Sequence, residues 1–123
     1  MQGTIYNYVR KVTTKEGVII GYQVIKSKTY YSFRYSKCIS IKLTDKYYDG
    51  ATGAKDINSF SWLFHDVLCR DGTFDDKTTC TNWQASVVMR DILQEENRWF
   101  RANSWFLATW LFGGGKARKN GMF

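Results

Sequence analysis

The sequence contains no proline, one histidine and only three cysteines among its 123 residues. The lack of proline argues against a polyproline segment or a proline-rich linker. Cys38, Cys69 and Cys80 cannot all pair and do not have the spacing of metal ligands, so we expect free thiols in a reducing compartment. The apolar runs are too short to cross a bilayer, and the first residues lack the pattern of a signal peptide. We therefore expect neither a transmembrane segment nor a signal peptide.

Acidic residues are scarce in the first half of the chain, which makes that half basic. Residues 1–50 contain nine of the 18 Lys and Arg residues but only three of the 11 Asp and Glu residues, and they hold all eight tyrosines. Basic and aromatic side chains on a sheet are typical of a nucleic-acid surface, but an ordinary half-exposed sheet has the same composition. Both interpretations stay open. For the first, the candidate contact residues are Tyr6, Tyr8, Arg10, Tyr30 and Arg34.

Residues 1–48 are rich in β-branched and aromatic residues, which predicts strands. The expected strands cover residues 4–12, 18–25, 29–35, 38–43 and 47–48. Because the turns between them are short, the strands should pair as an antiparallel β-meander. Ile39, Ile41 and Leu43 alternate with polar residues and should share the buried face.

A loop over residues 49–58 separates this half from a helical half over residues 59–113. The loop contains Gly50 and Gly53, which can bring backbone groups close to an ion. Asn58 or Ser59 is expected to cap the helix that follows. The apolar stripe of that helix has every position filled at helical spacing, with Phe60, Leu63, Phe64, Val67 and Leu68. Gly72 should end it.

Two further helices are predicted after this one. Thr81 and Gln84 match a capping box at the start of the second helix, on which Asp91 and Glu95 should face water. The third helix, about residues 98–112, has ten apolar residues of fifteen and is expected to be the central core helix. Residues 114–123 read as a basic tail. An aromatic helix followed by a basic tail also fits a membrane surface, and that alternative stays open.

The predicted fold is a single α+β domain over residues 1–123, in which the N-terminal antiparallel β-meander packs against a C-terminal bundle of three helices. Its core is expected to contain Ile39, Ile41, Phe60, Leu63, Phe64, Val67, Val88, Ile92, Trp105, Leu107 and Leu111.

The only histidine, His65, is followed by Asp66 on the first predicted helix. Both residues lie outside its apolar stripe. Adjacent helical residues point about 100° apart, so we do not expect these two side chains to pair with each other. A single histidine on a helix is usually structural, so the pair is interpreted as a latch that holds the glycine loop against the helix. A catalytic role is the alternative interpretation.

Four short motifs together resemble an uncharacterised family of tailed-bacteriophage and prophage proteins. They are Asp49-Gly50-Ala51-Thr52-Gly53, His65-Asp66-Val67-Leu68, Arg101-Ala102 and Leu111-Phe112-Gly113. The resemblance covers roughly residues 18–119 and implies phage origin and an α+β fold. The chain departs from the family pattern at Cys69, where tyrosine is usual, and at Ser86, where aspartate is usual.

A more distant similarity is to secreted phospholipases of the A-two type and the phospholipase domain of parvovirus capsids. This similarity implies that His65 is a general base and that Asp66 binds calcium with Asp49, Gly50 and Gly53. In those enzymes an aspartate on a second helix orients the histidine. Ser86 stands at that position here and cannot balance an imidazolium charge, which argues for a weak or inactive enzyme.

Three functions remain open from the sequence. The first is a small non-catalytic phage protein, a virion component or accessory factor that contacts other phage proteins and needs no cofactor, in the virion or the host cytoplasm. The second is a calcium-assisted hydrolase of lipid or cell-envelope esters that uses His65 and Asp66. The third is a nucleic-acid-binding or host anti-defence factor that uses the basic sheet.

Overall fold

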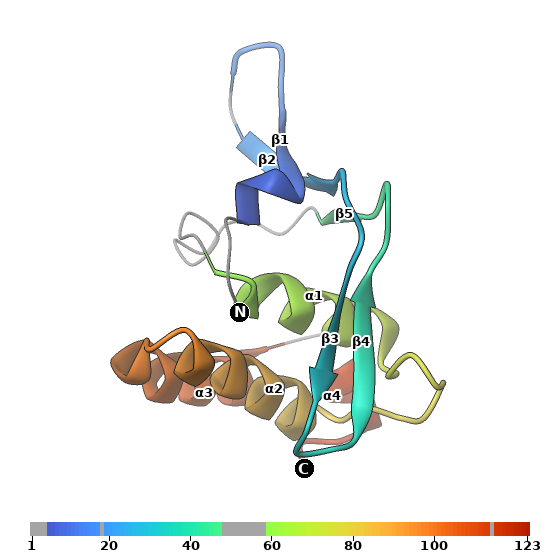
Figure 1. Cartoon of the computed structure of the whole chain (residues 1–123), viewed down its shortest axis with the longest axis vertical. Helices are drawn as coiled ribbons and strands as arrows, with labels where there is room; N and C mark the ends of the chain where they lie inside the picture. The colour runs from blue at the N-terminus through green and yellow to red at the C-terminus, as the bar shows by residue number, and fades with distance from the viewer. Residues whose placement is uncertain (1–4, 18, 48–58, 114) are drawn as a thin grey trace.

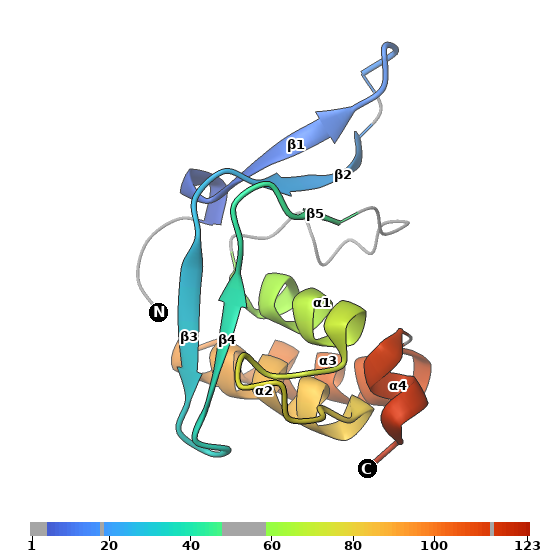
Figure 2. The ribbon, with the colours of Figure 1, turned by 90° about the vertical axis from the view of Figure 1, so that its right-hand side faces the viewer.

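The computed structural model describes residues 5–17, 19–47, 59–113 and 115–123, and it has an α+β architecture (Figure 1). Strands occupy the first half of the chain and helices the second, and the two halves pack together. The fold class predicted from the sequence is therefore confirmed. Figure 2 shows the paired strands β3 and β4 running down one side of the helical layer, with the other strands above it.

The strands pair antiparallel in two sheets. The first has the order β1-β2-β5, formed by Val9–Thr13, Ile19–Val24 and Lys46–Tyr47. Its register shifts between Val12 and Thr13, opposite Gly21, as at a β-bulge. A 3₁₀ turn, η1 (Ile5–Asn7), precedes β1, so the expectation of a strand from residue 4 onward is wrong at its start.

The second sheet is the hairpin of β3 (Lys28–Ser32) and β4 (Lys37–Ile41). Tyr30, Ile39 and Ile41 are buried on its inner face, as the alternation predicted for the two isoleucines. Leu43, which was expected beside them, is 60% exposed, because β4 ends at Ile41 and the chain then turns through Thr44 with a positive φ of 72°.

The helices are α1 (Ser61–Asp71), α2 (Asn82–Glu95), α3 (Trp99–Phe112) and a short α4 (Lys116–Asn120). Two of their boundary signals behave as predicted. Gly72 ends α1 in the left-handed conformation, and Thr81 and Gln84 form the full capping box of α2. The expected basic tail is not a tail, because part of it folds into α4 and buries Ala117 against the core.

The start of α1 is stabilised by a carboxylate from the far end of α2. The structure places the N-cap at Phe60 without a side-chain cap, although Ser59 Oγ accepts a hydrogen bond from the Ser61 N–H at 3.1 Å. Glu96 accepts hydrogen bonds from the Phe60 N–H at 3.1 Å and from the Ser59 hydroxyl at 2.5 Å. A carboxylate at a helix N-terminus satisfies free N–H groups and complements the helix dipole.

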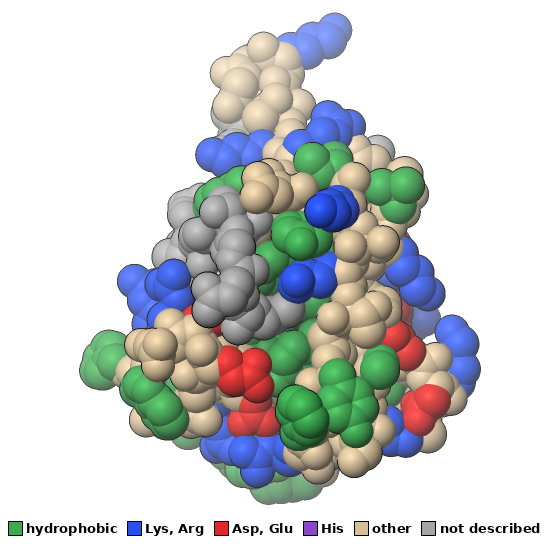
Figure 3. All heavy atoms as spheres, viewed as in Figure 1, with side chains coloured by type: hydrophobic (Ala, Val, Ile, Leu, Met, Phe, Trp, Pro, Cys, Tyr) green, Lys and Arg blue, Asp and Glu red, His purple; other side chains and the backbone are tan. Residues whose placement is uncertain are grey.

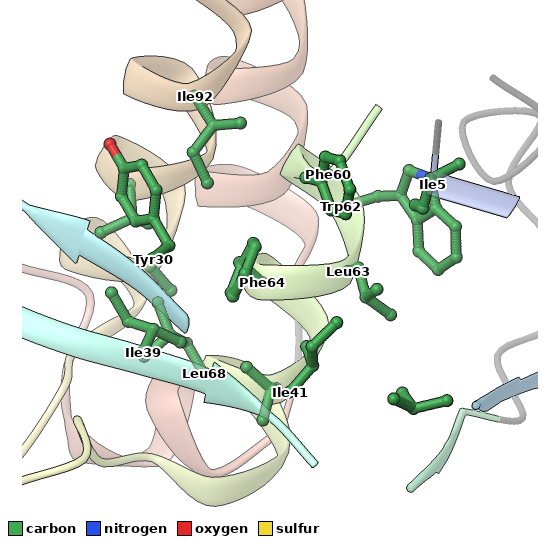
Figure 4. Close-up of a cluster of buried hydrophobic side chains, with 14 of the residues drawn as sticks. Ile5, Tyr30, Ile39, Ile41, Phe60, Trp62, Leu63, Phe64, Leu68 and Ile92 are labelled. Carbon is green, nitrogen blue, oxygen red and sulfur yellow. The ribbon is translucent and has the colours of Figure 1, made fainter. Parts of the chain in front are cut away.

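The central helix is α1, which packs against α2, α4 and β4. In Figure 4, side chains from β3 and β4 point towards Phe64 and Leu68 on α1, and Ile92 of α2 closes the cluster. Trp62 lies on another side of α1, with its ring 5.1 Å from that of Tyr22 on β2. Elements on several sides of α1 thus explain why seven of its eleven residues are buried.

The prediction that the third helix is the central core helix is wrong. Helix α3 packs mainly against α2, and only two of its side chains, Ala102 and Phe106, are fully buried. Leu107 and Leu111 are 52% and 46% exposed, and Trp105 is half-buried. A helix that is apolar nearly all round has no polar face to orient it, so its sequence does not indicate which side packs. The other eight predicted core residues are buried.

Candidate functional site

His65 lies within the packed part of α1 rather than on a solvent-facing side, and only 7% of it is exposed. Its Nε2 atom is 3.5 Å from Sγ of Cys69, which lies one helical turn further on. Its Nδ1 atom is 3.8 Å from Oδ1 of Asp66, an ion-pair distance, so the expectation that the two side chains would stay apart is wrong. Histidine, cysteine and aspartate thus meet at one point on α1.

The electrostatics of this group favour a charged imidazole. Burial opposes the charge, but the Cys69 sulfur and the Asp66 carboxyl outweigh that effect and raise the pKa of His65 to about 10. The raised pKa favours the protonated ring. A protonated imidazole has no free lone pair with which to accept a proton, so this shift disfavours His65 as a general base on water.

A charged His65 makes a clear prediction for pH dependence. Because its pKa is raised on folding from 6.5, the protonated residue stabilises the fold fully below pH 6.5, and this contribution is lost as the pH rises towards about 10. We expect the C2 proton of this single histidine, followed by NMR, to show no inflection between pH 5.5 and 8 in the folded chain. Cys69→Ala should lower the pKa of His65, because burial would remain while one attractive partner is removed. A wild-type inflection between pH 6 and 7 would contradict this description.

Among the described residues implied by the phospholipase similarity, Asp66 lies beside His65, whereas Ser86 is bonded to another helix. The hydroxyl of Ser86, at the position of the orienting carboxylate, lies 2.9 Å from that of Thr109 and is hydrogen bonded to it, so it points towards α3. The predicted calcium residues Asp49, Gly50 and Gly53 lie outside the described residues. Within the described ranges, no three His, Cys, Asp or Glu side chains are grouped as a metal ion would require.

The five candidate nucleic-acid contacts do not form one free surface. Tyr30 is buried, and its hydroxyl donates to Glu95 at 3.0 Å. Arg34 makes a bidentate ion pair with Asp91, in which Nε and Nη2 of the guanidinium donate to the carboxylate oxygens at 2.8 and 3.0 Å. The expectation that Asp91 faces water is therefore wrong, because its carboxylate joins α2 to the β3–β4 hairpin. Glu95 is exposed as expected, although it also accepts the Tyr30 hydrogen bond.

The other three candidates lie at or near the first sheet. Arg10 on β1 donates hydrogen bonds to the Gln23 side chain across the sheet. Tyr8 packs edge-on against the Phe60 ring at 5.2 Å and is covered by Lys28, whose Nζ is 5.0 Å from the Tyr8 ring. Tyr6 in η1 is 38% exposed. In Figure 3, Lys and Arg side chains are visible around this upper part of the molecule.

A hollow of about 200 Å³ lies beside β4, and its lining includes Val67 and Asp71 of α1. These two residues are about 200° and 240° around the helix from His65, so the hollow and the histidine are on different sides of α1. Its Asp75 carboxylate already accepts hydrogen bonds from the backbone and hydroxyl of Ser40. A substrate bound in the hollow would therefore not be in contact with His65.

The expectation of a central core helix missed the outer face of α3, which we define as Phe100, Leu107, Leu111 and Phe112. Phe100 and Phe112 are 85% and 83% exposed. Trp99 is 59% exposed but lies seven residues before the buried Phe106, on the other side of the helix. Phe100, Leu107 and Leu111 recur at i, i+7 and i+11, so they form one stripe along the helix. The ten apolar residues in this segment were visible in the sequence, but the pattern did not show that six of them are exposed.

Comparison with known proteins finds no matching protein-family model, curated protein or solved structure. Within the described residues, no helix reaches the length and hydropathy of a membrane-spanning segment.

Proposed function

We propose that this chain is a small non-catalytic component of a bacteriophage virion, and that it works by binding another protein through the outer face of α3. The observation that supports this proposal most strongly is the exposure of four large apolar side chains on this face. The largest exposed apolar patch of a protein is often a site of interaction with another molecule. The resemblance of four short motifs to phage and prophage proteins supports the proposal that the partner is part of a virion.

The described geometry favours binding over hydrolysis. The contacts with Cys69 and Asp66 raise the pKa of His65 and so favour its protonated form, whereas the hydrolytic scheme needs a neutral imidazole that can accept a proton from water. Ser86 is bonded to Thr109 and supplies no carboxylate. The contacts of His65 with Cys69 and Asp66 instead suit a structural role within α1.

The described geometry also favours a protein partner over nucleic acid. Nucleic-acid binding depends mainly on cationic groups that can reach phosphates. Arg34 is paired with Asp91, and Lys37 is paired with Asp76 at 2.5 Å, so two cations of the β3–β4 hairpin are already partly neutralised. The outer face of α3, in contrast, is apolar.

The proposal is tested by counting copies of the chain in purified virions of the phage whose genome encodes it, by quantitative mass spectrometry. Wild-type chain should be present. Leu107→Glu should lower its copy number about tenfold or more, because a charge placed in a buried apolar contact is costly. The matched control is Leu43→Glu, which makes the same change at a leucine that is 60% exposed and lies outside α3.

Three results would count against the proposal. The wild-type chain could be missing from virions, Leu107→Glu could leave the copy number unchanged, or Leu43→Glu could reduce it equally. Far-UV circular dichroism of both variants checks that neither substitution has unfolded the chain. Both leucines are at least half exposed, so neither change should disturb the core.

A further inference from the structure

We propose that the occupant of the outer face of α3 is the same face of a second copy of this chain, so that two α3 helices pair across a two-fold axis. This inference rests on the proposed function, because it names the first protein that the face binds. Twofold pairing is the commonest symmetry of homo-oligomers, and it needs a patch that complements itself.

The chemistry of the face suits such pairing. Phe100, Leu107 and Leu111 carry no charge, and the small residues Ser104 and Ala108 lie on the same exposed side of α3. The hydroxyl of Ser104 donates to the Phe100 carbonyl at 3.1 Å, so covering this residue would leave no unpaired donor. Small residues beside a stripe of large ones allow two helix axes to approach to about 8–10 Å.

The exposed area of the face is more than half of what each partner of a dimer contributes. With about 200 Å² for a fully exposed aromatic side chain and somewhat less for leucine, the four exposed fractions amount to about 500 Å². This is in the upper part of the range of about 300–600 Å² for the largest apolar patch on a monomer. It is also about three fifths of the roughly 800 Å² that each partner contributes to a standard interface.

The positions of the nearby cations favour a second copy over an anionic partner such as an acidic protein or a phospholipid surface. Arg101 lies over the Trp105 ring of its own helix at 5.4 Å. Arg118 donates to the carbonyls of Leu111 and Gly113, at 3.0 and 2.7 Å, and so caps the end of α3. An anionic partner would need these side chains to reach outward, whereas the structure uses both within the chain.

The test is sedimentation equilibrium of the purified full chain over a range of concentrations and salt. Wild-type protein should reach twice the chain mass of 14.4 kDa. Because each chain has a net charge of +7, raising NaCl from about 0.1 to 0.5 M should strengthen the dimer or leave it unchanged. Leu107→Glu should raise the dimer dissociation constant on the order of 100-fold, since the interface would hold two unpaired charges. Leu43→Glu should not change it.

Several results would overturn the pairing. They are a wild-type monomer at all concentrations, a dimer that dissociates as salt is raised, or equal effects of Leu107→Glu and Leu43→Glu. Leu111→Glu is a second variant on the face and should act like Leu107→Glu; a full-strength dimer in both would also overturn the pairing. Binding of a monomer to anionic vesicles would instead assign the face to a membrane surface.

The failure of this inference and that of the proposed function can be told apart. A chain that is monomeric in sedimentation, but whose incorporation into virions depends on Leu107, would overturn the pairing and leave the proposed function standing. A chain that forms a stable dimer but is missing from virions would overturn the proposed function and leave the pairing standing.

Discussion

Replacing Gly115 with alanine is expected to lower the free energy of unfolding by about 3 to 5 kcal/mol. Gly115 precedes α4 with φ 87° and ψ −167°, a region that is essentially limited to glycine. A Cβ atom at this position would lie 2.5 Å from the carbonyl oxygen of Cys69, and backbone cannot easily move away. The substitution therefore combines backbone strain with a collision between α4 and α1.

Gly17 provides the matched control for this substitution. It has a similar φ of 83°, but a Cβ there would meet nothing within 4 Å. Gly17→Ala should therefore cost only the strain, about 1 kcal/mol. Urea denaturation measures both effects. Limited trypsin digestion adds a local readout, because Lys116, Arg118 and Lys119 should become cleavable if α4 leaves its site.

Equal unfolding midpoints for Gly115→Ala and Gly17→Ala, together with unchanged trypsin resistance of α4, would contradict the contact between α4 and α1. The burial of Ala117 and the hydrogen bonds from Asn120 to the carbonyls of Gly72 and Cys80 would then need another explanation.

The second substitution with a large expected effect is Glu96→Gln, which should lower the free energy of unfolding by about 2 to 3 kcal/mol. The Glu96 carboxylate accepts hydrogen bonds from the Phe60 N–H and from the Ser59 hydroxyl. A glutamine amide keeps the shape but turns one of its two polar atoms into a donor, so the bond with the Ser59 hydroxyl must reverse or be lost, and neither bond is charge-assisted any longer. The favourable charge at the N-terminus of α1 is lost as well.

The neighbouring residue is the control for Glu96. Glu95→Gln also removes a carboxylate, which accepts one hydrogen bond from Tyr30 at 3.0 Å, but this residue is exposed. Its cost should stay below about 1 kcal/mol. Thermal or urea unfolding of the two variants gives the comparison. If Glu95→Gln were as destabilising as Glu96→Gln, the capping of α1 by Glu96 would be ruled out as a major source of stability.

Much of the helical half could be predicted from local signals. The stripe from Phe60 to Leu68 predicted α1 and its buried side because its apolar positions have helical spacing. The capping box of Thr81 and Gln84 and the glycine at residue 72 predicted boundaries because their chemistry depends on nearby residues alone.

The parts that could not be predicted depend on contacts between distant residues. Glu96 caps a helix that begins 35 residues earlier, and Asp91 pairs with Arg34, which is 57 residues away. No local pattern marks such partners. The burial of His65 has the same origin, since the elements packed around α1 also cover sides that its apolar stripe leaves open.

The exposure of α3 was missed for a different reason. Its sequence is apolar on every side, and such a helix is usually buried. In this fold α1 occupies the centre, and α3 lies on the far side of α2, so about half of its apolar residues remain at the surface. The mismatch between composition and position is the reason for assigning binding to α3.

The central claim is that the chain works through the outer face of α3 and not through chemistry at His65. The most direct test is the copy number in purified virions for wild type, Leu107→Glu, Leu43→Glu and Cys69→Ala, with folding checked for each. We expect incorporation of wild type, Leu43→Glu and Cys69→Ala, and loss of Leu107→Glu. Full incorporation of Leu107→Glu, or absence of the wild-type chain from virions, would contradict the claim.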